Sequence, residues 1–301
     1  MILCDRVIVE RSGQMVVDRL SLEVAPGETL AVIGRTAAGK SSLLAAIATA
    51  IPVHGGDITV AGRSVRRSPD AVRQVVGYAP PLLPPPPGLT AAEFLTLFAS
   101  AAGLAGAEQR AAVERGLAAA GLATQGAARL DRLPEGSWKL LLLGRALLHG
   151  PAVLVLDDPF GGLDPVQHRW LERLIEDLRL SGRTVVAAID DARIADCFTS
   201  LAVLHEGRLR AHGPADPATI APGRSWRHRV VCHGMAERAA AVARRLVADV
   251  DLVDAHVFDC TLPSAGSAVA RLVDRLVAEG VEVTAVGVHP SWTEQLVDDS
   301  V

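Results

Sequence analysis

The clearest chemistry in this sequence lies in the stretch from Gly34 to Ser42, which has the pattern G-x-x-x-x-G-K-S. An apolar, β-prone run precedes it at 29–33, and an alanine- and leucine-rich segment with good helix propensity follows it. A strand, such a loop and a helix in this order predict a P-loop, whose backbone N–H groups and helix N-terminus bind phosphate. An ordinary glycine-containing βα turn is the alternative, and it is disfavoured because both flanking elements stand where the motif needs them. The predicted phosphate-binding residues are Gly34, Arg35, Thr36, Ala37, Ala38, Gly39, Lys40, Ser41 and Ser42.

Two side chains of this loop have expected roles of their own. The Lys40 ammonium is expected to reach the β- and γ-phosphates of a nucleotide, and the Ser41 hydroxyl to help hold Mg²⁺. Lysine is scarce in this chain, since Lys139 is the only other one, so a lysine at the phosphate position is informative. Asp157 ends an apolar run at 152–156 that is typical of a strand buried in a parallel sheet. Its carboxylate is expected to hold Mg²⁺, through water, opposite Ser41.

Composition limits the other possibilities. The chain has 301 residues, enough for two domains, and half of it is hydrophobic while aromatic residues are only 3%. A formal charge of −4 argues against a dedicated nucleic-acid surface. Four scattered cysteines without a C-x-x-C pair indicate buried or incidental thiols in a reducing compartment. With no signal peptide and no apolar run of membrane-spanning length, we expect a protein that reaches any membrane through a partner.

The order of predicted elements is typical of an α/β fold. Strands alternate with helices, which indicates a parallel, doubly wound sheet. A proline-rich connector at 80–88 leads into an alanine-rich helical region from Thr90 to about Leu148, where Thr90 and Glu93 form a predicted capping box. A Pro/Gly-rich linker follows the α/β region. The predicted domains are 1–213, with a helical subdomain at about 82–148, then the linker at 214–225 and a small α+β domain at 226–301.

The ordered motifs resemble the ATP-binding-cassette (ABC) ATPase family over about residues 1–213. Leu133-Pro134-Glu135-Gly136-Ser137 stands where that family has its signature Leu-Ser-Gly-Gly-Gln, and Gly162-Leu163-Asp164-Pro165 matches its D-loop without change. The turn Leu204-His205-Glu206-Gly207-Arg208 is similar to the family's last strand and turn. The resemblance implies a P-loop NTPase with a helical subdomain that binds ATP and Mg²⁺. It also implies a homo- or heterodimer in which Gly136 and Asp164 contact the other subunit.

Several positions depart from the family pattern. Pro81 replaces a glutamine that senses Mg²⁺ and the attacking water, and it has no polar side-chain group. Asp158 replaces the glutamate that acts as general base, so a shorter carboxylate must reach the water. Ile189 or Asp190, depending on a one-residue choice of alignment, replaces the histidine that contacts the γ-phosphate. In the signature, Pro134 removes a hydroxyl and an N–H, and Glu135 brings a carboxylate toward a polyphosphate.

The pattern of losses predicts a function. Groups that bind Mg-ATP are kept and groups that serve hydrolysis are changed, so we expect an ATP-binding subunit with impaired or absent hydrolysis. The alternatives are a slow energising ATPase that uses Asp158 as general base and a soluble ABC protein outside transport. The C-terminal domain is similar to the extension of ABC proteins that pair with ABC-2-type exporters, and Pro290–Val297 is similar to its terminal segment. This resemblance implies an integral-membrane permease partner, a position at the inner face of the cell membrane and no nucleic-acid partner.

Overall fold

The structure, a computed structural model, describes residues 1–81, 83–190, 197–216, 225–247, 249–263 and 266–289. These residues divide into two compact units, one up to His212 and the other from Gly213 onward. Both units combine helices and strands, and the first has the α/β architecture that the alternation of strands and helices predicted. No helix in the described part of the chain is long and apolar enough to cross a membrane.

The first unit contains two sheets. One is a four-stranded antiparallel sheet with the order β2-β1-β4-β5. Its strands are β1 (Ile2–Arg11), β2 (Gln14–Val24), β4 (Gly55–Val60) and β5 (Arg63–Ser64). The other is a six-stranded sheet with the order β10-β9-β3-β8-β7-β6. Its strands are β3 (Thr29–Ile33), β6 (Val76–Ala79), β7 (Val153–Asp157), β8 (Thr184–Ala188), β9 (Ser200–His205) and β10 (Arg208–Pro214).

The parallel strands of the larger sheet set the position of the predicted site. β3 pairs in parallel with β8 and β9, and β7 pairs in parallel with β6 and β8. Every residue of β3, β7 and β8 is buried, as expected for central strands covered on both faces. Because parallel strands end at the same edge, the segments that follow β3, β7 and β8 meet there.

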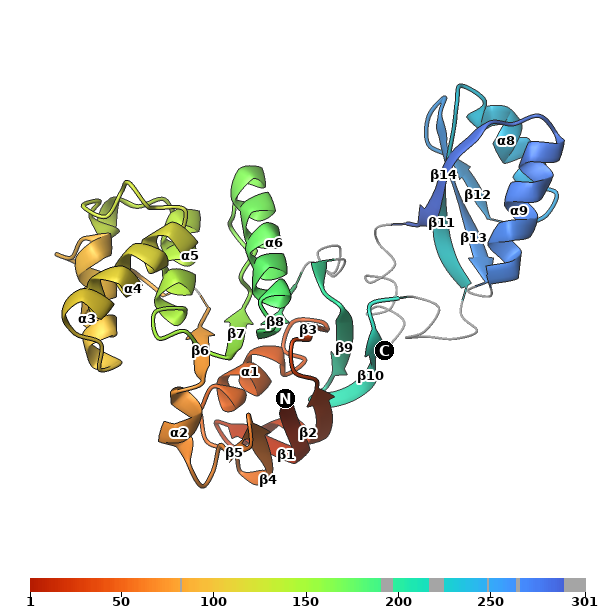
Figure 1. Cartoon of the computed structure of the whole chain (residues 1–301). Helices are drawn as coiled ribbons and strands as arrows, with labels where there is room; N and C mark the ends of the chain where they lie inside the picture. Colours follow the sequence, from red (N-terminus) through yellow and green to blue (C-terminus); the bar gives the residue numbers. More distant parts are fainter. Residues whose placement is uncertain (82, 191–196, 217–224, 248, 264–265, 290–301) are drawn as a thin grey trace. The chain divides into compact units, whose positions relative to one another are not determined.

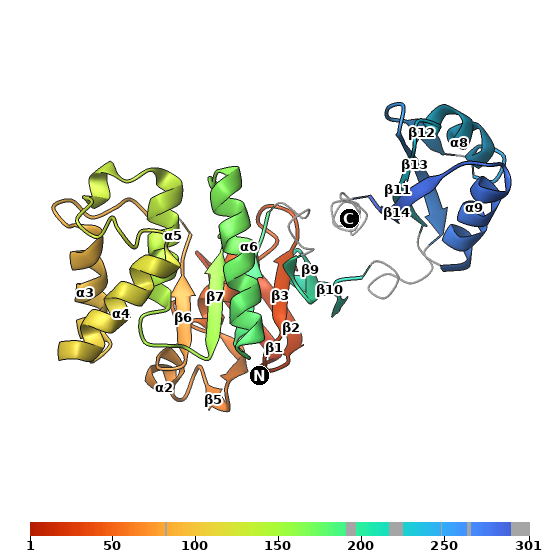
Figure 2. The same cartoon turned by 45° about the horizontal axis from the view of Figure 1, so that its top comes forward.

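Helix α1 (Lys40–Ile47) lies between the two sheets of this unit. It contacts β1 and β2 on one side and β7 and β8 on the other, and one apolar core joins all of these elements. Seven of its eight residues are buried, so its position is fixed by packing on both sides. Helix α6 (Pro165–Leu180) covers the sheet beside β7 and β8, as Figures 1 and 2 show. The core thereby anchors the helix that begins at the P-loop lysine.

Three helices gather on the outer side of β6 (Figures 1 and 2). They are α3 (Ala91–Ala101), α4 (Gly106–Ala119) and α5 (Glu135–Ala146), and each contacts the other two. The predicted capping box is present, because Thr90 Oγ1 accepts from the Glu93 N–H at 3.3 Å and Glu93 accepts from the Thr90 N–H at 2.8 Å. Short helical turns at Pro69–Arg73 (α2) and Leu130–Arg132 complete the unit.

The second unit has the chain order β-α-β-β-α-β. Its elements are β11 (Ser225–Cys232), α8 (Ala236–Ala243), β12 (Val250–Leu252), β13 (Val257–Pro263), α9 (Gly266–Ala278) and β14 (Val283–Val288). The sheet order β12-β13-β11-β14 with antiparallel pairing is that of a ferredoxin-like fold. Phe258, Leu272 and Leu276 are almost fully buried in a core that belongs to this unit.

Several observed boundaries differ from the expected ones. β11 begins at Ser225, inside the expected linker, and β10 extends to Pro214 at the other end of it. Residues 217–224, the middle of the expected linker, and the terminal segment from Pro290 lie outside the described residues.

Candidate nucleotide-binding site

A cavity of about 470 Å³ opens at the carboxyl edge of the six-stranded sheet. It is lined by P-loop residues together with Asp157, the last residue of β7, Asp158, which follows it, and Asp190, two residues beyond β8. The structure therefore brings the predicted residues Thr36 to Ser42 and the predicted Mg²⁺-binding Asp157 into one cavity, whereas Gly34 and Arg35 are not among its lining residues. Its lining residues are Arg11, Val16, Thr36, Ala37, Ala38, Gly39, Lys40, Ser41, Ser42, Pro81, Asp157, Asp158, Ala188 and Asp190.

Lys40 lines this cavity but is largely buried, and its ammonium group is hydrogen bonded. Its side chain is 7% exposed, and Nζ donates to the carbonyl oxygens of Gly34 at 2.6 Å and Arg35 at 3.1 Å. The third contact is an ion pair with Asp190 Oδ1 at 3.0 Å. An ammonium has three donors, so these contacts satisfy Lys40 completely.

The loop backbone takes conformations that suit glycine at two positions. Gly39 has φ +100°, and a Cβ there would lie 2.4 Å from the Val16 carbonyl oxygen. Gly34 has φ +154°, and a Cβ there would lie 2.3 Å from the Leu204 carbonyl oxygen. The motif therefore requires both glycines for steric reasons. Ala37 also takes a left-handed conformation, with φ +66°, although it carries a methyl group.

Ser41 and Asp157 form the part of the cavity suited to a metal ion. Ser41 Oγ donates to Asp157 Oδ1 at 2.9 Å, while the buried Asp157 Oδ2 has no hydrogen-bond partner among the described residues. Burial raises the pKa of Asp157, and the nearby charges of Asp158 and Asp190 raise it further, while the Ser41 hydrogen bond lowers it. A buried carboxylate oxygen without a partner beside a hydroxyl fits a hard cation such as Mg²⁺.

Asp158 is held in place by groups outside the P-loop. Its Oδ2 accepts from Lys139 Nζ at 2.9 Å, and Lys139 also donates to the Asp158 carbonyl oxygen at 2.8 Å. Its Oδ1 accepts from the Gly161 N–H at 3.2 Å. A Cβ on Gly161 would lie 2.3 Å from Asp158 Oδ2, so the carboxylate occupies space that only a glycine leaves open. Both carboxylate oxygens are thus occupied by protein donors.

The two candidates for the γ-phosphate position differ in their surroundings. Ile189 is 2% exposed, and its N–H donates to the Val32 carbonyl oxygen at 3.1 Å, which extends the pairing of β8 with β3. Asp190 is 69% exposed at its side chain and lines the cavity in contact with Lys40. Of the two, Asp190 is the residue that meets the predicted phosphate-binding group.

The degenerate signature lies at the start of α5, apart from this chain's own cavity lining. Pro134 is the N-cap of α5, Glu135 is exposed in its first turn and Gly136 is buried. A Cβ on Gly136 would lie 2.2 Å from Gln167 Oε1. The same Gln167 oxygen accepts a hydrogen bond from the Asp164 N–H at 3.1 Å. Gln167 therefore lies between Gly136, which it approaches closely, and Asp164, to which it is hydrogen bonded.

Pro81 and Arg11 complete the cavity rim. Pro81 lines the cavity at the expected position and offers no polar side-chain group there. Arg11, the last residue of β1, also lines it. A guanidinium can stack on a nucleobase, so Arg11 is a candidate for base binding.

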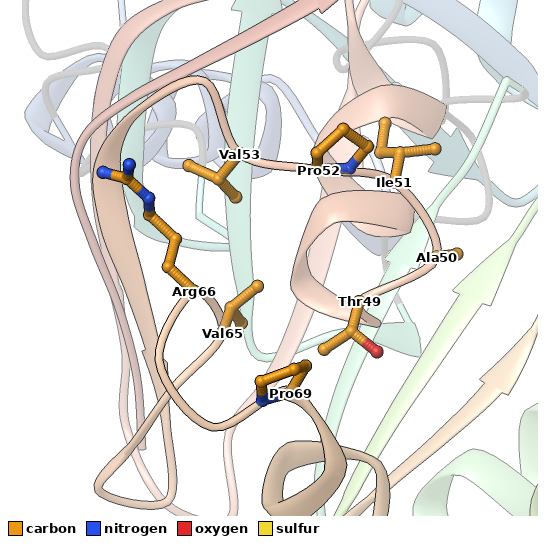
Figure 3. A pocket seen from close by; sticks show the side chains of 8 residues that line it. All are labelled: Thr49, Ala50, Ile51, Pro52, Val53, Val65, Arg66 and Pro69. Carbon is orange, nitrogen blue, oxygen red and sulfur yellow. The ribbon is translucent and has the colours of Figure 1, made fainter.

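A second cavity, of about 390 Å³, lies beyond the end of α1 (Figure 3). Its lining is mostly aliphatic and proline side chains, among them Val53 and Val65. The two polar side chains in its lining are already hydrogen bonded: Arg66 donates to the Gly56 carbonyl oxygen and Thr49 accepts from Arg73. This cavity has no carboxylate and no phosphate-binding loop among the described residues of its lining, in contrast to the P-loop cavity.

Comparisons with known proteins agree with this geometry. A family model described as ABC transporter matches residues 17–161. Nod factor export ATP-binding protein I of Paraburkholderia xenovorans is 33% identical over 218 residues, which cover 72% of this chain and 71% of that protein. This chain belongs to the ATP-binding proteins of ABC transporters.

Two further comparisons of this ABC protein add information that its sequence motifs do not give: one covers more of the chain, and the other compares the fold. The linearmycin resistance ATP-binding protein LnrL of Bacillus subtilis is 24% identical over 265 residues, 88% of this chain and 85% of that protein, a length that reaches into the second unit. A dimeric ATP-binding cassette in a post-hydrolysis state with ADP and phosphate superposes with a TM-score of 0.65 at 21% identity. That match covers 71% of this chain and 99% of the cassette, and it shows that the fold is the same.

Sequence reasoning missed the role of one residue of this ABC protein, Lys139. It is 9% exposed at its side chain and reaches Asp158 from α5, across a separation of 19 residues. Its spacing in the sequence carries no motif that predicts this contact. The available signal was the scarcity of lysine in a chain whose basic residues are nearly all arginine.

Proposed function

We propose that this chain is the ATP-binding subunit of an ABC-2-like exporter and that it binds Mg-ATP with impaired or absent hydrolysis. The observation that carries the proposal is a contrast within one cavity. Lys40, Ser41 and Asp157 line one cavity with the P-loop, which supports nucleotide binding, whereas each oxygen of Asp158 accepts a hydrogen bond from Lys139 or Gly161.

Nucleotide binding in this proposal follows from the P-loop and its two polar partners. The N–H groups around Gly39 and the start of α1 would hold the phosphates, and Lys40 would contact the terminal ones. Ser41 and Asp157 would hold Mg²⁺, which supplies charge neutralisation at the β- and γ-phosphate oxygens when bound. The unpartnered oxygen of Asp157 supports this role.

Hydrolysis is impaired in this proposal because the catalytic positions lack suitable groups. A general base must be within hydrogen-bond reach of the attacking water and have an acceptor available. Each oxygen of Asp158 keeps a second lone pair, but the hydrogen bonds from Lys139 and Gly161 fix the direction of the carboxylate, and Pro81 has no side-chain group that could orient a water. In a second subunit's site, Pro134 and Glu135 would replace donors with a repulsive carboxylate.

The proposed partners come from the relatives and from the second unit. The matched relatives are named for Nod factor export and linearmycin resistance, and the latter match extends into the ferredoxin-like unit. An exporter subunit without a spanning helix in its described part would act through an integral-membrane permease at the inner face of the cell membrane. Gly136 and Asp164, joined by Gln167, are the proposed contacts to a second ATP-binding subunit.

A slow energising ATPase is the second candidate function. One observation favours it: Asp158 lines the cavity, and its side chain is 40% exposed, so a modest rotation would return the carboxylate to the phosphates. A non-transport role has less support, because the two relatives described above are named for export and resistance.

The two candidates are separated by measuring Mg-ATP binding and phosphate release on the same preparation. Lys40→Ala is expected to weaken Mg-ATP binding by about 10–100-fold, because it removes a charge-assisted contact to phosphate. Arg115→Ala removes an exposed cation on α4 and is the matched control. It is expected to leave the affinity for Mg-ATP unchanged.

Phosphate release is expected to be the same in the wild type, Asp158→Asn and Lys40→Ala. The preparation should include the co-expressed permease, so that an activity dependent on assembly is not overlooked. Release in the wild type that collapses in Asp158→Asn would favour the slow ATPase. Mg-ATP binding that is indifferent to Lys40→Ala would refute the proposed nucleotide site.

A further inference from the structure

The ion pair between Lys40 and Asp190 places an anion where a nucleotide's own anion is expected. Lys40 Nζ contacts two backbone carbonyl oxygens and one carboxylate, and the carboxylate is the only charged member of the three. A phosphate that approaches Lys40 must therefore compete with Asp190 for the same ammonium.

The position of Asp190 identifies which phosphate it competes with. β8 lies between β3 and β7 in the sheet, with Ala188 paired to both Val32 and Asp157. Asp190 follows two residues later, so it lies between the start of the P-loop and the Ser41–Asp157 pair. The negative charge of Asp190 is also felt at Asp157, where it contributes to the raised pKa of that carboxyl group.

This end of the cavity is the end of the terminal phosphate. A P-loop lysine reaches the β- and γ-phosphates, and the metal ion beside the P-loop serine bridges the same two groups. Three aspartates line this end of the cavity, Asp157, Asp158 and Asp190. Lys139 neutralises Asp158, and Lys40 is the cation that faces Asp190.

We propose that Asp190 sets the nucleotide selectivity of this site, so that it favours a nucleoside diphosphate over a nucleoside triphosphate. The carboxylate competes with any bound phosphate for Lys40, but it repels a triphosphate more strongly, because the γ-phosphate adds negative charge at this end of the cavity and a diphosphate lacks that group. The inference rests on the proposed nucleotide site and adds its preferred ligand.

The exposure of Asp190 makes the selectivity moderate rather than absolute. Its side chain is 69% exposed, so solvent and salt screen its charge and the side chain has room to turn away. A triphosphate therefore still binds, at the cost of the Lys40–Asp190 contact. This also predicts that the preference for the diphosphate weakens as ionic strength rises.

The test compares equilibrium dissociation constants for Mg-ADP and Mg-ATP, measured by titration calorimetry on the full chain at two salt concentrations. The wild type is expected to bind Mg-ADP more tightly than Mg-ATP at low salt. Asp190→Asn keeps the shape of the side chain and removes its charge. It is expected to tighten Mg-ATP binding about tenfold, the equivalent of one pKa unit of charge interaction, with a smaller effect on Mg-ADP. Asp177→Asn removes an exposed carboxylate on α6 and serves as the matched control.

The outcomes separate this inference from the proposed nucleotide site. Both nucleotides could bind through Lys40 while Asp190→Asn changes their two dissociation constants equally or not at all. Asp190 would then not set selectivity, and the nucleotide site would stand. If neither nucleotide binds, or if Lys40→Ala leaves binding intact, both proposals are overturned. A tenfold gain for Mg-ATP that disappears at high salt is the result that supports the charge-based mechanism.

Discussion

At the scale of single residues, the ammonium group of each of the two lysines forms an ion pair with an aspartate that lines the P-loop cavity. Lys40 pairs with Asp190 at 3.0 Å, and Lys139 pairs with Asp158 at 2.9 Å. A lysine ammonium is a compact point charge, and each of these also donates to backbone carbonyl oxygens. The other cationic side chains of this chain, apart from histidine, are arginines. The guanidinium group of arginine is planar and wider than an ammonium, so it is less suited to these sites. The two pairs keep the carboxylates of the cavity partly neutralised when no nucleotide is bound.

Ala37 is the P-loop residue at which a single substitution should gain stability. Its φ of +66° costs an alanine about 1–2 kcal/mol, which a glycine does not pay. Ala37→Gly is therefore expected to raise the free energy of unfolding by about 0.5–1 kcal/mol, after allowance for the greater freedom of glycine in the unfolded chain. Urea denaturation measures this change. Ala111→Gly, inside α4, is the control of opposite sign, with an expected loss of about 1 kcal/mol. A loss of stability in both variants would contradict the strain at Ala37.

The site could be predicted from sequence only where a local pattern defines a contact. The motif alone placed Lys40 and Ser41 on a loop between a strand and a helix, and the apolar run before Asp157 placed that carboxylate at a strand end. Two contacts were beyond reach: Lys139 with Asp158 and Lys40 with Asp190. Both join segments far apart in the sequence through long or exposed side chains, and no spacing rule encodes them.

At the scale of elements, α6 begins at a residue with two predicted roles. Asp164 is its N-cap: one carboxylate oxygen accepts from the N–H groups of Val166 at 2.8 Å and Gln167 at 2.9 Å, and Gln167 completes the capping box. The same aspartate is a proposed contact to a second subunit. The cap is a property of the single chain, so its contribution can be measured without the second subunit.

Asp164→Ala is expected to lower the free energy of unfolding by about 1 kcal/mol, because two N–H groups lose their acceptor. Asp164→Ser keeps a capping oxygen and should retain most of the stability. Denaturant unfolding of the two variants measures the cap, and sedimentation with Mg-ATP measures association. A serine variant that is stable but no longer associates would separate the two roles. An alanine variant as stable as the wild type would show that the cap contributes little.

The lengths of β1 and β2 show why some elements escaped sequence analysis. Turn residues at 11–13 and 26–28 predict strands at Arg6–Glu10 and Ser21–Val24, whereas the observed strands have 10 and 11 residues. Arg6 and Arg19 both have positive φ, and the pairing register shifts between Cys4 and Val7. A bulge of this kind breaks the alternation of buried and exposed residues, so the period-2 pattern that identifies a strand is lost. The fully buried strands β3 and β8 follow the sequence pattern directly: the apolar runs that begin at Thr29 and Thr184 predict strands at 29–33 and 184–188, which are the observed boundaries.

At the scale of the whole molecule, each of the two units has a hydrophobic core of its own among the described residues. The core of the first unit joins its two sheets through α1, and the core of the second unit lies between its sheet and helices α8 and α9. Ile58 and Phe258 are both 0% exposed, one in each core. Only the first unit contains the P-loop cavity. A ligand of that cavity therefore acts on the stability of one core directly.

These two cores predict two thermal transitions with different sensitivities. Ile58→Ala is expected to cost about 2–5 kcal/mol and Phe258→Ala about 3–5 kcal/mol, each in its own unit. The second unit is smaller, so a given loss should lower its midpoint by more degrees. A nucleotide that binds the folded P-loop cavity should raise the midpoint temperature of only one transition, the one that Ile58→Ala lowers. The gain in stability should grow with the logarithm of the free nucleotide concentration.

Differential scanning calorimetry with and without Mg-ADP tests all three expectations. Leu180→Ala and Val277→Ala, at exposed positions of the two units, are the controls. A single transition that both core substitutions lower and that the nucleotide raises as a whole would mean that the two units unfold together.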